Sequence, residues 1–539
     1  MLRSPREHAS NLQDAPLGPE DAHGRDDIEE SFINVGQLTS GAGTGSNLLP
    51  TRVVVGRKGS GKTHILRHIE HVSRGQGRDV SLSQIDRNLF AENALNPFKG
   101  GLGPAAARAF WTDVWRFALI VAVLSRFMCK RRDQRAVAAL EKVGMSLEEL
   151  RSDFAPFMFD CMRPLDPVQA LQKIQNTHRS ISGLQLAFRG IVFSEIEAEL
   201  GHLLQHYGEV HFIIDGLDDL AWIDPRSWLD LQVGLFKLVF LQSASRAYMK
   251  SVHLTISLRN YVYSHALKDT HADRVGAGVL KLTWDAEAAK LFLNQRLLQV
   301  CDGNFANASR LKGARPLASW LGFDSYRPAS RSQAEDVEYY VLRHTRCAPR
   351  QVIKAFNEIC GVYNRLHLRG VEFTPEAFGS AVASRARDHA RAMISTAAEE
   401  LLSMLMNSLT LPHQPSQKSS AQDYHLTVAS DALAAAIRQC RREICDREDL
   451  RIACLLALDA FDLDVDEAHL SRLVEATLWR SGIVAYRATD PNGIKGWRYT
   501  WTEGELGMET FPDHVTRIGF HPTMIDLCDL EVDVDGPVF

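Results

Sequence analysis

The sequence has no strong excess of charge of either sign and no long hydrophobic run. Of its 539 residues, 61 are Lys or Arg and 66 are Asp or Glu, which gives a formal net charge of −5. This balance argues against a nucleic-acid binder that is basic along its whole length, although it allows a local basic patch. The longest apolar run, residues 117–124, falls far short of the ~20 residues that span a bilayer. We therefore expect no membrane segment and no membrane partner.

The sequence also lacks cysteine pairs with metal-ligand spacing and an apolar leader. Its nine cysteines are scattered, and no two form a Cys-x-x-Cys pair. An odd, unclustered set favours reduced thiols and argues against a zinc knuckle. The first 30 residues are polar and acidic without an apolar core, which is unlike a secretory signal. These absences favour a soluble cytoplasmic protein.

Short apolar runs separated by helical patterns dominate the first half of the chain. Residues 1–30 carry few large apolar side chains, so we expect a disordered tail there. The runs are 52–55, 80–85, 210–215 and 252–257, and 105–127 and 186–207 are the main helical stretches between them. Continuous apolar strands of this kind are typical of a parallel sheet that is buried on both faces. The pattern predicts an α/β fold, a doubly wound parallel sheet, over residues 31–275.

The second half has helical spacing followed by a hairpin signal. Residues 276–410 are predicted to form a helical lid, with helices at 285–300, 335–343, 349–363 and 375–409. A polar linker is predicted at 411–426. Residues 427–539 then show three helices and two strands that flank Asp490-Pro491-Asn492-Gly493, where Asn-Gly is typical of a hairpin turn. This order predicts a small winged-helix-like α+β domain.

One motif points directly to a nucleotide. The segment between the first strand and the following helix matches GxxxxGK[ST] in full, and its residues are Gly56, Arg57, Lys58, Gly59, Ser60, Gly61, Lys62 and Thr63. The glycines let backbone N–H groups converge on phosphate oxygens, and the helix directs its positive end at the same anion. Lys62 is expected to reach the β- and γ-phosphates, and the Thr63 hydroxyl to bind Mg²⁺.

Polar residues at later strand ends extend this candidate site. Asp215 ends the strand 210–215, where Mg²⁺ needs a carboxylate. Asp218 or Asp219 is a candidate to orient or deprotonate the attacking water. Arg259 follows the strand 252–257 and could sense the γ-phosphate, and Arg350 could reach the phosphates from the lid. The plainer alternatives are an acidic turn and two surface arginines.

These residues resemble a known family. The segments VVVGRKGSGKT, FIIDGLDDL and TISLRN are similar to the STAND branch of P-loop ATPases, relatives of the AAA+ and origin-recognition ATPases. CAPRQVIKAFNEI resembles the "PR" helix of bacterial ATPases of this kind, and the resemblance covers about residues 32–405. It implies ATP as the nucleotide, Mg²⁺ bound by Asp215, hydrolysis served by an acid of the Asp218–Asp219 pair, and Arg259 as first sensor.

The same resemblance implies a regulatory output. A slow ATPase would switch the lid and the C-terminal domain between arrangements and so control assembly of copies or a partner effector protein, as in bacterial signalling or antiphage defence. ATP·Mg²⁺ would lie at the domain junction. No repeat array like the sensor domains of large STAND proteins is visible.

Three alternatives stay open at this stage. The first is a DNA-associated AAA+-type ATPase (a loader, remodeller or repair factor), the second a P-loop kinase, and the third a nucleotide-binding scaffold without hydrolysis. The basic stretches 126–135 and 438–451 and the residues Lys495, Trp497 and Arg498 allow DNA contact. However, the predicted reader helix 466–480 carries three acids and two arginines, whereas a major-groove helix should present more positive or amide side chains. DNA is therefore not the favoured partner.

Overall fold

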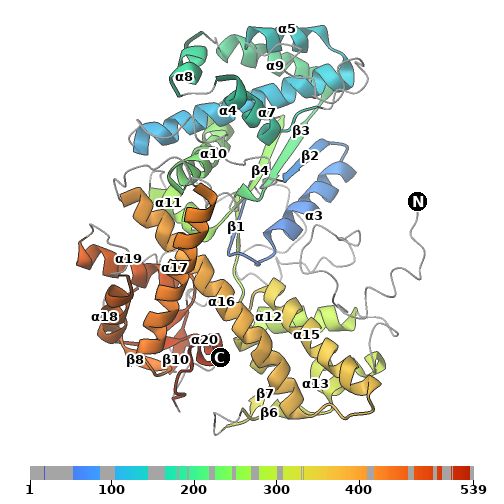
Figure 1. Ribbon diagram of the computed structural model, residues 1–539. Helices are drawn as coiled ribbons and strands as arrows, with labels where there is room; N and C mark the ends of the chain where they lie inside the picture. Colours follow the sequence, from blue (N-terminus) through green and yellow to red (C-terminus); the bar gives the residue numbers. More distant parts are fainter. Residues whose placement is uncertain are drawn as a thin grey trace. The chain divides into compact units, whose positions relative to one another are not determined.

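The computed structural model divides the chain into two compact units (Figure 1). The sheet unit comprises Ser46–Arg57 and Lys62–Lys281, and the C-terminal unit comprises Met1–Gly45, Lys58–Gly61 and Leu282–Phe539. The structure describes residues 17, 52–84, 104–143, 164–178, 181–190, 193–217, 225–245, 251–268, 278–299, 307–328, 331, 333–408, 418–458, 466–489, 495–499, 511–512 and 514–533. No helix in these ranges is both long enough and apolar enough to cross a bilayer.

The sheet unit is built on five strands in the order β2-β3-β4-β1-β5. Their bounds are β1 Val53–Gly56, β2 Asp79–Gln84, β3 Val210–Asp215, β4 Val252–Leu258 and β5 Val279–Leu282. Strands β2, β3, β4 and β1 pair in parallel, so their carboxyl ends meet at one edge. Every residue of β1 and β3 is buried, which explains why most of their residues are apolar. The predicted α/β fold with a parallel sheet is confirmed.

Helices fill the connections between these strands. They are α3 Lys62–Gly75, α4 Pro104–Arg131, α5 Gln134–Lys142, α7 Pro167–His178, α8 Ile181–Gly190, α9 Phe193–Tyr207, α10 Pro225–Ser245 and α11 Asn260–Lys268. Helix α3 packs along the sheet, and α10 contacts both β4 and α4 (Figure 1). The prediction of one helix over 186–207 is wrong, because α8 ends at Gly190 and α9 begins at Phe193. Glycine is the ordinary residue least favourable to a helix interior, so the break falls where helix propensity is lowest.

The first part of the C-terminal unit, residues 282–408, is mostly helical as predicted. Its elements are α12 Ala286–Leu298, the 3₁₀ turn Ala308–Arg310, α13 Pro316–Leu321, β6 Ser325–Tyr326, β7 Glu335–Asp336, α14 Val337–Arg343, α15 Pro349–Leu368 and α16 Pro375–Ser408. Its core includes Trp320, Phe356 and Phe378. Leu17 belongs to this core as well, and its backbone N–H donates to Asn357 Oδ1 at 3.2 Å. Sequence reasoning assigned no packing role to residue 17.

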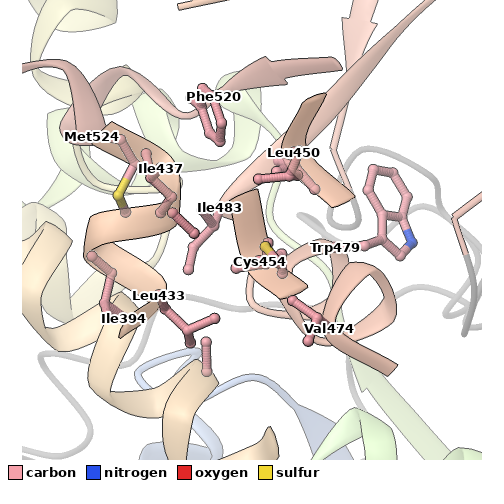
Figure 2. Close-up of a cluster of buried hydrophobic side chains, with 14 of the residues drawn as sticks. Ile394, Leu433, Ile437, Leu450, Cys454, Val474, Trp479, Ile483, Phe520 and Met524 are labelled. Carbon is pink, nitrogen blue, oxygen red and sulfur yellow. The ribbon is translucent and has the colours of Figure 1, made fainter. Parts of the chain in front are cut away.

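The last part of the chain combines helices with a small sheet. Its elements are α17 Lys418–Gln439, β8 Ile444–Asp446, α18 Arg447–Leu458, α19 Glu467–Arg480, β9 Val484–Thr489, β10 Lys495–Arg498, β11 Arg517–Phe520 and α20 Pro522–Cys528. The sheet has the order β10-β9-β11-β8, with antiparallel pairing throughout. Figure 2 shows its core, in which Ile394 of α16 lies with Leu433, Ile437 and Trp479. Because α16 supplies part of this core, α16 and the small sheet region form one body.

The linker predicted for this region is shorter in the structure, and the predicted hairpin strands are present. The linker predicted over 411–426 is too long, because α17 already begins at Lys418. Polar composition suggested a loop there, but Lys, Ala and Gln are also good helix formers. The predicted three helices and two strands are present, and β9 and β10 pair with Thr489 opposite Lys495. The Asp490–Gly493 turn lies outside the described residues. Sequence reasoning missed β8, β11 and α20.

Candidate nucleotide site

The predicted phosphate-binding loop connects β1 to α3. Gly59 and Gly61 have φ values of +82° and +94°, a region that side chains with a Cβ rarely adopt. Helix α3 begins at Lys62, so the first unpaired backbone N–H groups of the helix adjoin the loop. A β1-loop-α3 unit of this form offers backbone donors to an anion.

The ammonium of Lys62 lies inside the loop. The residue is 7% exposed, and Nζ donates hydrogen bonds to the carbonyls of Gly56 at 3.1 Å and Arg57 at 3.2 Å. A buried cation beside backbone N–H groups supplies positive charge where solvent screens it little. The position therefore suits the phosphates of a nucleotide.

Asp215 meets the phosphate-binding loop at the carboxyl edge of the sheet. The Thr63 hydroxyl donates to Asp215 Oδ2 at 2.6 Å, although 152 positions separate the two residues. Asp215 is 5% exposed and ends β3, while Thr63 lies in the first turn of α3. Only β4 lies between β1 and β3, so the start of α3 after β1 and the carboxyl end of β3 lie close together.

The donor set at this edge fits Mg²⁺. Mg²⁺ takes oxygen ligands and is usually held in proteins by one or two carboxylates together with waters and substrate phosphates. Asp215 offers the carboxylate and Thr63 the hydroxyl, both on described elements of one unit. When bound there, Mg²⁺ would neutralise phosphate charge.

Ser257 is a site residue that sequence reasoning missed. Its buried hydroxyl donates to Asp215 Oδ1 at 2.5 Å from the end of β4. Both carboxylate oxygens of Asp215 therefore accept a side-chain hydroxyl, one from each neighbouring element. The available signal was a hydroxyl near the end of an apolar strand that the sheet order places beside Asp215.

The tip of the loop, Lys58–Gly61, is held by residues of its own unit. Trp284 Nε1 donates to the Ser60 carbonyl at 3.0 Å, and the Arg350 backbone N–H donates to the Gly59 carbonyl at 3.3 Å. A Cβ placed on Gly59 would lie 3.3 Å from Arg350 Cβ, so a side chain there would press on α15. The structure thus places Arg350 against the loop, at the start of α15. Trp284 was not predicted from sequence.

The remaining predicted residues fall at the same edge or outside the described residues. Arg259 directly follows β4 and precedes α11, and its carbonyl accepts from the Tyr263 N–H at 3.1 Å. Its role as a sensor stays a prediction. Asp218 and Asp219 lie outside the described residues, so their role in hydrolysis also stays a prediction.

A buried histidine ties α3 to the sheet behind the loop. His211 of β3 is 1% exposed; Nδ1 lies 2.9 Å from Ser73 Oγ of α3, and Nε2 lies 2.8 Å from Thr255 Oγ1 of β4. Burial lowers the pKa of His211 to about 3, because the charged imidazolium would lose its hydration. The ring is therefore neutral at physiological pH and joins three elements by hydrogen bonds.

Some basic side chains of the stretches that suggested DNA contact pair with acids of the fold, whereas others, such as Arg135 and Arg442, are exposed. In the first stretch, Arg126 Nη2 and Lys130 Nζ both contact Asp79 Oδ1, at 2.6 and 2.7 Å. In the second, Arg447 Nη2 contacts Glu475 Oε2 at 2.8 Å, and Arg451 also approaches Glu475. Glu475 belongs to α19, the predicted reader helix. These contacts give the arginines a packing role.

Comparison with known proteins adds only distant likenesses. No protein-family model and no curated protein matches the sequence. Among solved structures, the Aeropyrum pernix ORC1 protein in complex with DNA is 12% identical, with 95% of this chain and 93% of that chain covered and a TM-score of 0.32. The Aeropyrum pernix ORC2 protein (ADPNP-ADP complexes) is 12% identical, with coverages of 98% and 93% and a TM-score of 0.36.

A third solved structure, CDC6P from Pyrobaculum aerophilum, is 11% identical, with coverages of 95% and 97% and a TM-score of 0.26. At these TM-scores the likenesses carry no argument about function. The functional argument rests on the loop, on Asp215 and on the residues around them.

Proposed function

We propose that this chain binds ATP with Mg²⁺ and hydrolyses it slowly as a regulatory switch ATPase. The observation that carries the proposal is the 2.6 Å contact between the Thr63 hydroxyl and Asp215, which joins the phosphate-binding loop to a strand-end carboxylate. A solitary glycine-rich turn would not require a buried carboxylate beside it. A hydroxyl and a carboxylate beside the loop, here Thr63 and Asp215, are the groups that hold Mg²⁺ next to nucleotide phosphates.

The roles follow from the positions. Lys62 and the loop N–H groups bind the phosphates, and Thr63 and Asp215 hold Mg²⁺. Ser257 fixes the orientation of the Asp215 carboxylate. In this proposal Arg259 senses the γ-phosphate, and Asp218 or Asp219 serves the attacking water.

The switch part of the proposal rests on the loop tip. The carbonyls of Gly59 and Ser60 are hydrogen-bonded to Arg350 at the start of α15 and to Trp284 just before α12. A nucleotide that moves the tip would break or strain these bonds, so the helices at 286–368 would respond to nucleotide state. The output is then assembly of copies or control of a protein partner.

The DNA-associated alternative makes a different prediction. If the chain were a DNA-dependent ATPase, duplex DNA should raise the hydrolysis rate, and exposed cations should carry the contact. Arg126, Arg447 and Arg451 pair with acids of the fold and are not available for such a contact. Arg135 and Arg442 of the same stretches are exposed, so the effect of DNA on the rate decides between the two functions. A kinase would transfer phosphate to an acceptor, so its products would lack free phosphate.

Equilibrium binding of ATP in the presence of Mg²⁺ tests the site. Lys62→Ala should lose measurable triphosphate binding while circular dichroism shows an intact fold, because alanine is the best helix former at the first position of α3. Lys142→Ala, an exposed lysine at the end of α5, is the matched control and should bind as the natural chain does. Equal binding by Lys62→Ala and the natural chain would refute the site.

A further inference from the structure

Leu17 is held by side chains from two helices of the C-terminal unit. Its own side chain is 2% exposed and belongs to the apolar core that α12, α13, α14 and α15 share. Its backbone N–H donates to Asn357 Oδ1 of α15 at 3.2 Å, and its carbonyl accepts from Arg296 Nη2 of α12 at 3.0 Å. These partners lie 340 and 279 positions away in the sequence. Both main-chain polar groups of one residue are therefore bound by side chains of distant helices.

A residue held in this way is bound as a peptide is bound. Hydrogen bonds to main-chain groups supply affinity for any sequence, whereas an apolar pocket selects the side chain. Arg296 is 7% exposed, and its Nη1 donates to Gln299 Oε1 at 2.9 Å, which fixes the guanidinium while Nη2 binds the Leu17 carbonyl. The site therefore fits a peptide with a leucine-sized apolar side chain.

The two helices that hold Leu17 also hold the tip of the phosphate-binding loop. Trp284, two residues before α12, donates to the Ser60 carbonyl, and Arg350 at the start of α15 donates to the Gly59 carbonyl. Helices α12 and α15 pack against each other (Figure 1). A residue that is hydrogen-bonded to both helices restrains their separation. It therefore also restrains the spacing of the two groups that hold the tip.

We propose that Arg296, Asn357 and the core beside them form an exchangeable peptide-docking site, which the chain's own segment at Leu17 fills and whose occupancy opposes ATP binding. Docked Leu17 stabilises the arrangement of α12 and α15 in which the tip is held, and a nucleotide that moves the tip favours its release. The coupling to ATP rests on the proposed function, whereas the docking site does not. By linkage, ATP weakens the docking of Leu17 by the factor by which Leu17 weakens ATP binding.

Covalent attachment explains how a single anchoring residue keeps the site filled. A tethered ligand can bind at an effective concentration on the order of a millimolar, so a weak interaction is enough within one chain. A separate peptide of the same sequence lacks this advantage and must compete with the tethered segment. Removing the leucine anchor should therefore open the site to a peptide added in solution.

Fluorescence anisotropy of a labelled peptide of residues 10–24 tests the docking site. The full-length natural chain is compared with Leu17→Asp, in which the charged side chain cannot enter an apolar core. We expect Leu17→Asp to bind the peptide at least about tenfold more tightly, because the tethered segment no longer competes. A peptide that carries Leu17→Asp should bind neither chain. Equal binding of the natural peptide by both chains, or no binding by Leu17→Asp, would overturn the proposal.

Two further chains locate the site. Leu368→Asp, at an 86% exposed leucine of α15, is the matched control and should bind the peptide as weakly as the natural chain does. Asn357→Ala added to Leu17→Asp should weaken peptide binding, because the acceptor for the leucine N–H is lost. Unchanged affinity in this double variant would refute the assigned site. Circular dichroism checks the fold, and Leu17→Ala, which adds no charge, replaces Leu17→Asp if that chain does not fold.

ATP titrations test the coupling. Leu17→Asp should bind ATP about fivefold more tightly than the natural chain, at the low end of the usual range of coupling between sites. Saturating ATP should weaken peptide binding by Leu17→Asp by the same factor. Equal ATP affinities, with peptide binding indifferent to ATP, would overturn the coupling and leave the proposed ATPase standing. Failure of every chain to bind ATP would refute the proposed function and the coupling with it, but not the docking site.

Discussion

At the residue scale, the carboxylate of Asp215 is the centre of the candidate site. It accepts the hydroxyls of Thr63 and Ser257, from α3 and β4 respectively. A buried carboxylate with both oxygens hydrogen-bonded is held in one orientation, and such preorganisation is what a metal ligand requires.

Ser257→Ala tests that orientation. The change leaves the buried Oδ1 of Asp215 without its donor from β4. The free energy of unfolding should fall by about 1.5–3 kcal/mol, the usual contribution of a hydrogen bond to a charged group. We expect Mg²⁺ to support ATP binding less well in this variant. In a titration of Mg²⁺ at fixed ATP, the midpoint should therefore lie at a higher Mg²⁺ concentration. Ser182→Ala, an exposed serine of α8, is the control. An unchanged Mg²⁺ midpoint would show that Ser257 does not position Asp215.

Sequence identified part of this site and missed part for a physical reason. Lys62, Thr63 and Asp215 are predictable because phosphate and Mg²⁺ chemistry restricts the residue types and their place next to strands. Ser257 and Trp284 are not, because a serine in a strand and a tryptophan before a helix occur for many reasons. Their roles depend on sheet order and on a contact across 224 positions.

At the element scale, the strands were the most predictable feature. Strands β1, β3 and β4 match the predicted runs closely, because burial on both faces favours apolar residues over most of their length. Helix ends were less predictable, as the break at Gly190 and the early start of α17 at Lys418 show. Local composition favoured one helix over 186–207 and a linker over 411–426. The fold instead has two helices in the first range and the start of α17 in the second.

The packing of α10 on α4 gives a second prediction. A Cβ on Gly234 would lie 2.6 Å from Trp111 Cβ and 2.9 Å from the Thr112 backbone nitrogen, so Gly234→Ala forces the helices apart. We expect the free energy of unfolding to fall by about 1–3 kcal/mol in urea titrations, the usual cost of overpacking. Gly75→Ala, with no atom within 4 Å of its added Cβ, should change stability little. Equal stability of the two variants would contradict this packing.

The bonds of His211 to α3 and β4 predict a pH dependence. Its pKa of about 3 in the folded state lies below the ordinary value of 6.5, so the unfolded chain binds one more proton between these limits. The stability from this group is fully present above pH 6.5 and is lost as pH falls from 6.5 towards 3, by about 1.4 kcal/mol per pH unit.

His211→Gln removes this group, so the free energy of unfolding should depend less steeply on pH between 6.5 and 3. The difference in slope should be about 1.4 kcal/mol per pH unit, which corresponds to one proton. The measurement is the free energy of unfolding against pH for both chains, and the difference between the two curves isolates His211. Parallel curves between pH 6.5 and 4 would contradict the assignment of a depressed pKa to this residue.

At the scale of the whole molecule, the loop tip belongs to the C-terminal unit, where Trp284 holds it. Trp284→Phe keeps an aromatic ring beside Phe292 but removes the donor to the Ser60 carbonyl. Because nucleotide binding would break or strain this bond, its removal, worth about 1 kcal/mol, should tighten ATP binding by up to about fivefold in a binding titration.

Trp320→Phe is the matched control for this prediction. Trp320 is buried in the same core but packs against Phe356 and Tyr363. It should lower stability and leave ATP affinity unchanged. If both variants bind ATP equally well, Trp284 does not link the loop to nucleotide binding.

The most direct test of the central claim is phosphate release from ATP by the purified chain, with and without duplex DNA, beside Lys62→Ala. The switch ATPase predicts slow, Mg²⁺-dependent release that DNA leaves unchanged and that Lys62→Ala abolishes. Strong stimulation by DNA that Lys62→Ala abolishes would instead support the DNA-associated ATPase. Release that persists in Lys62→Ala would contradict the account of the site.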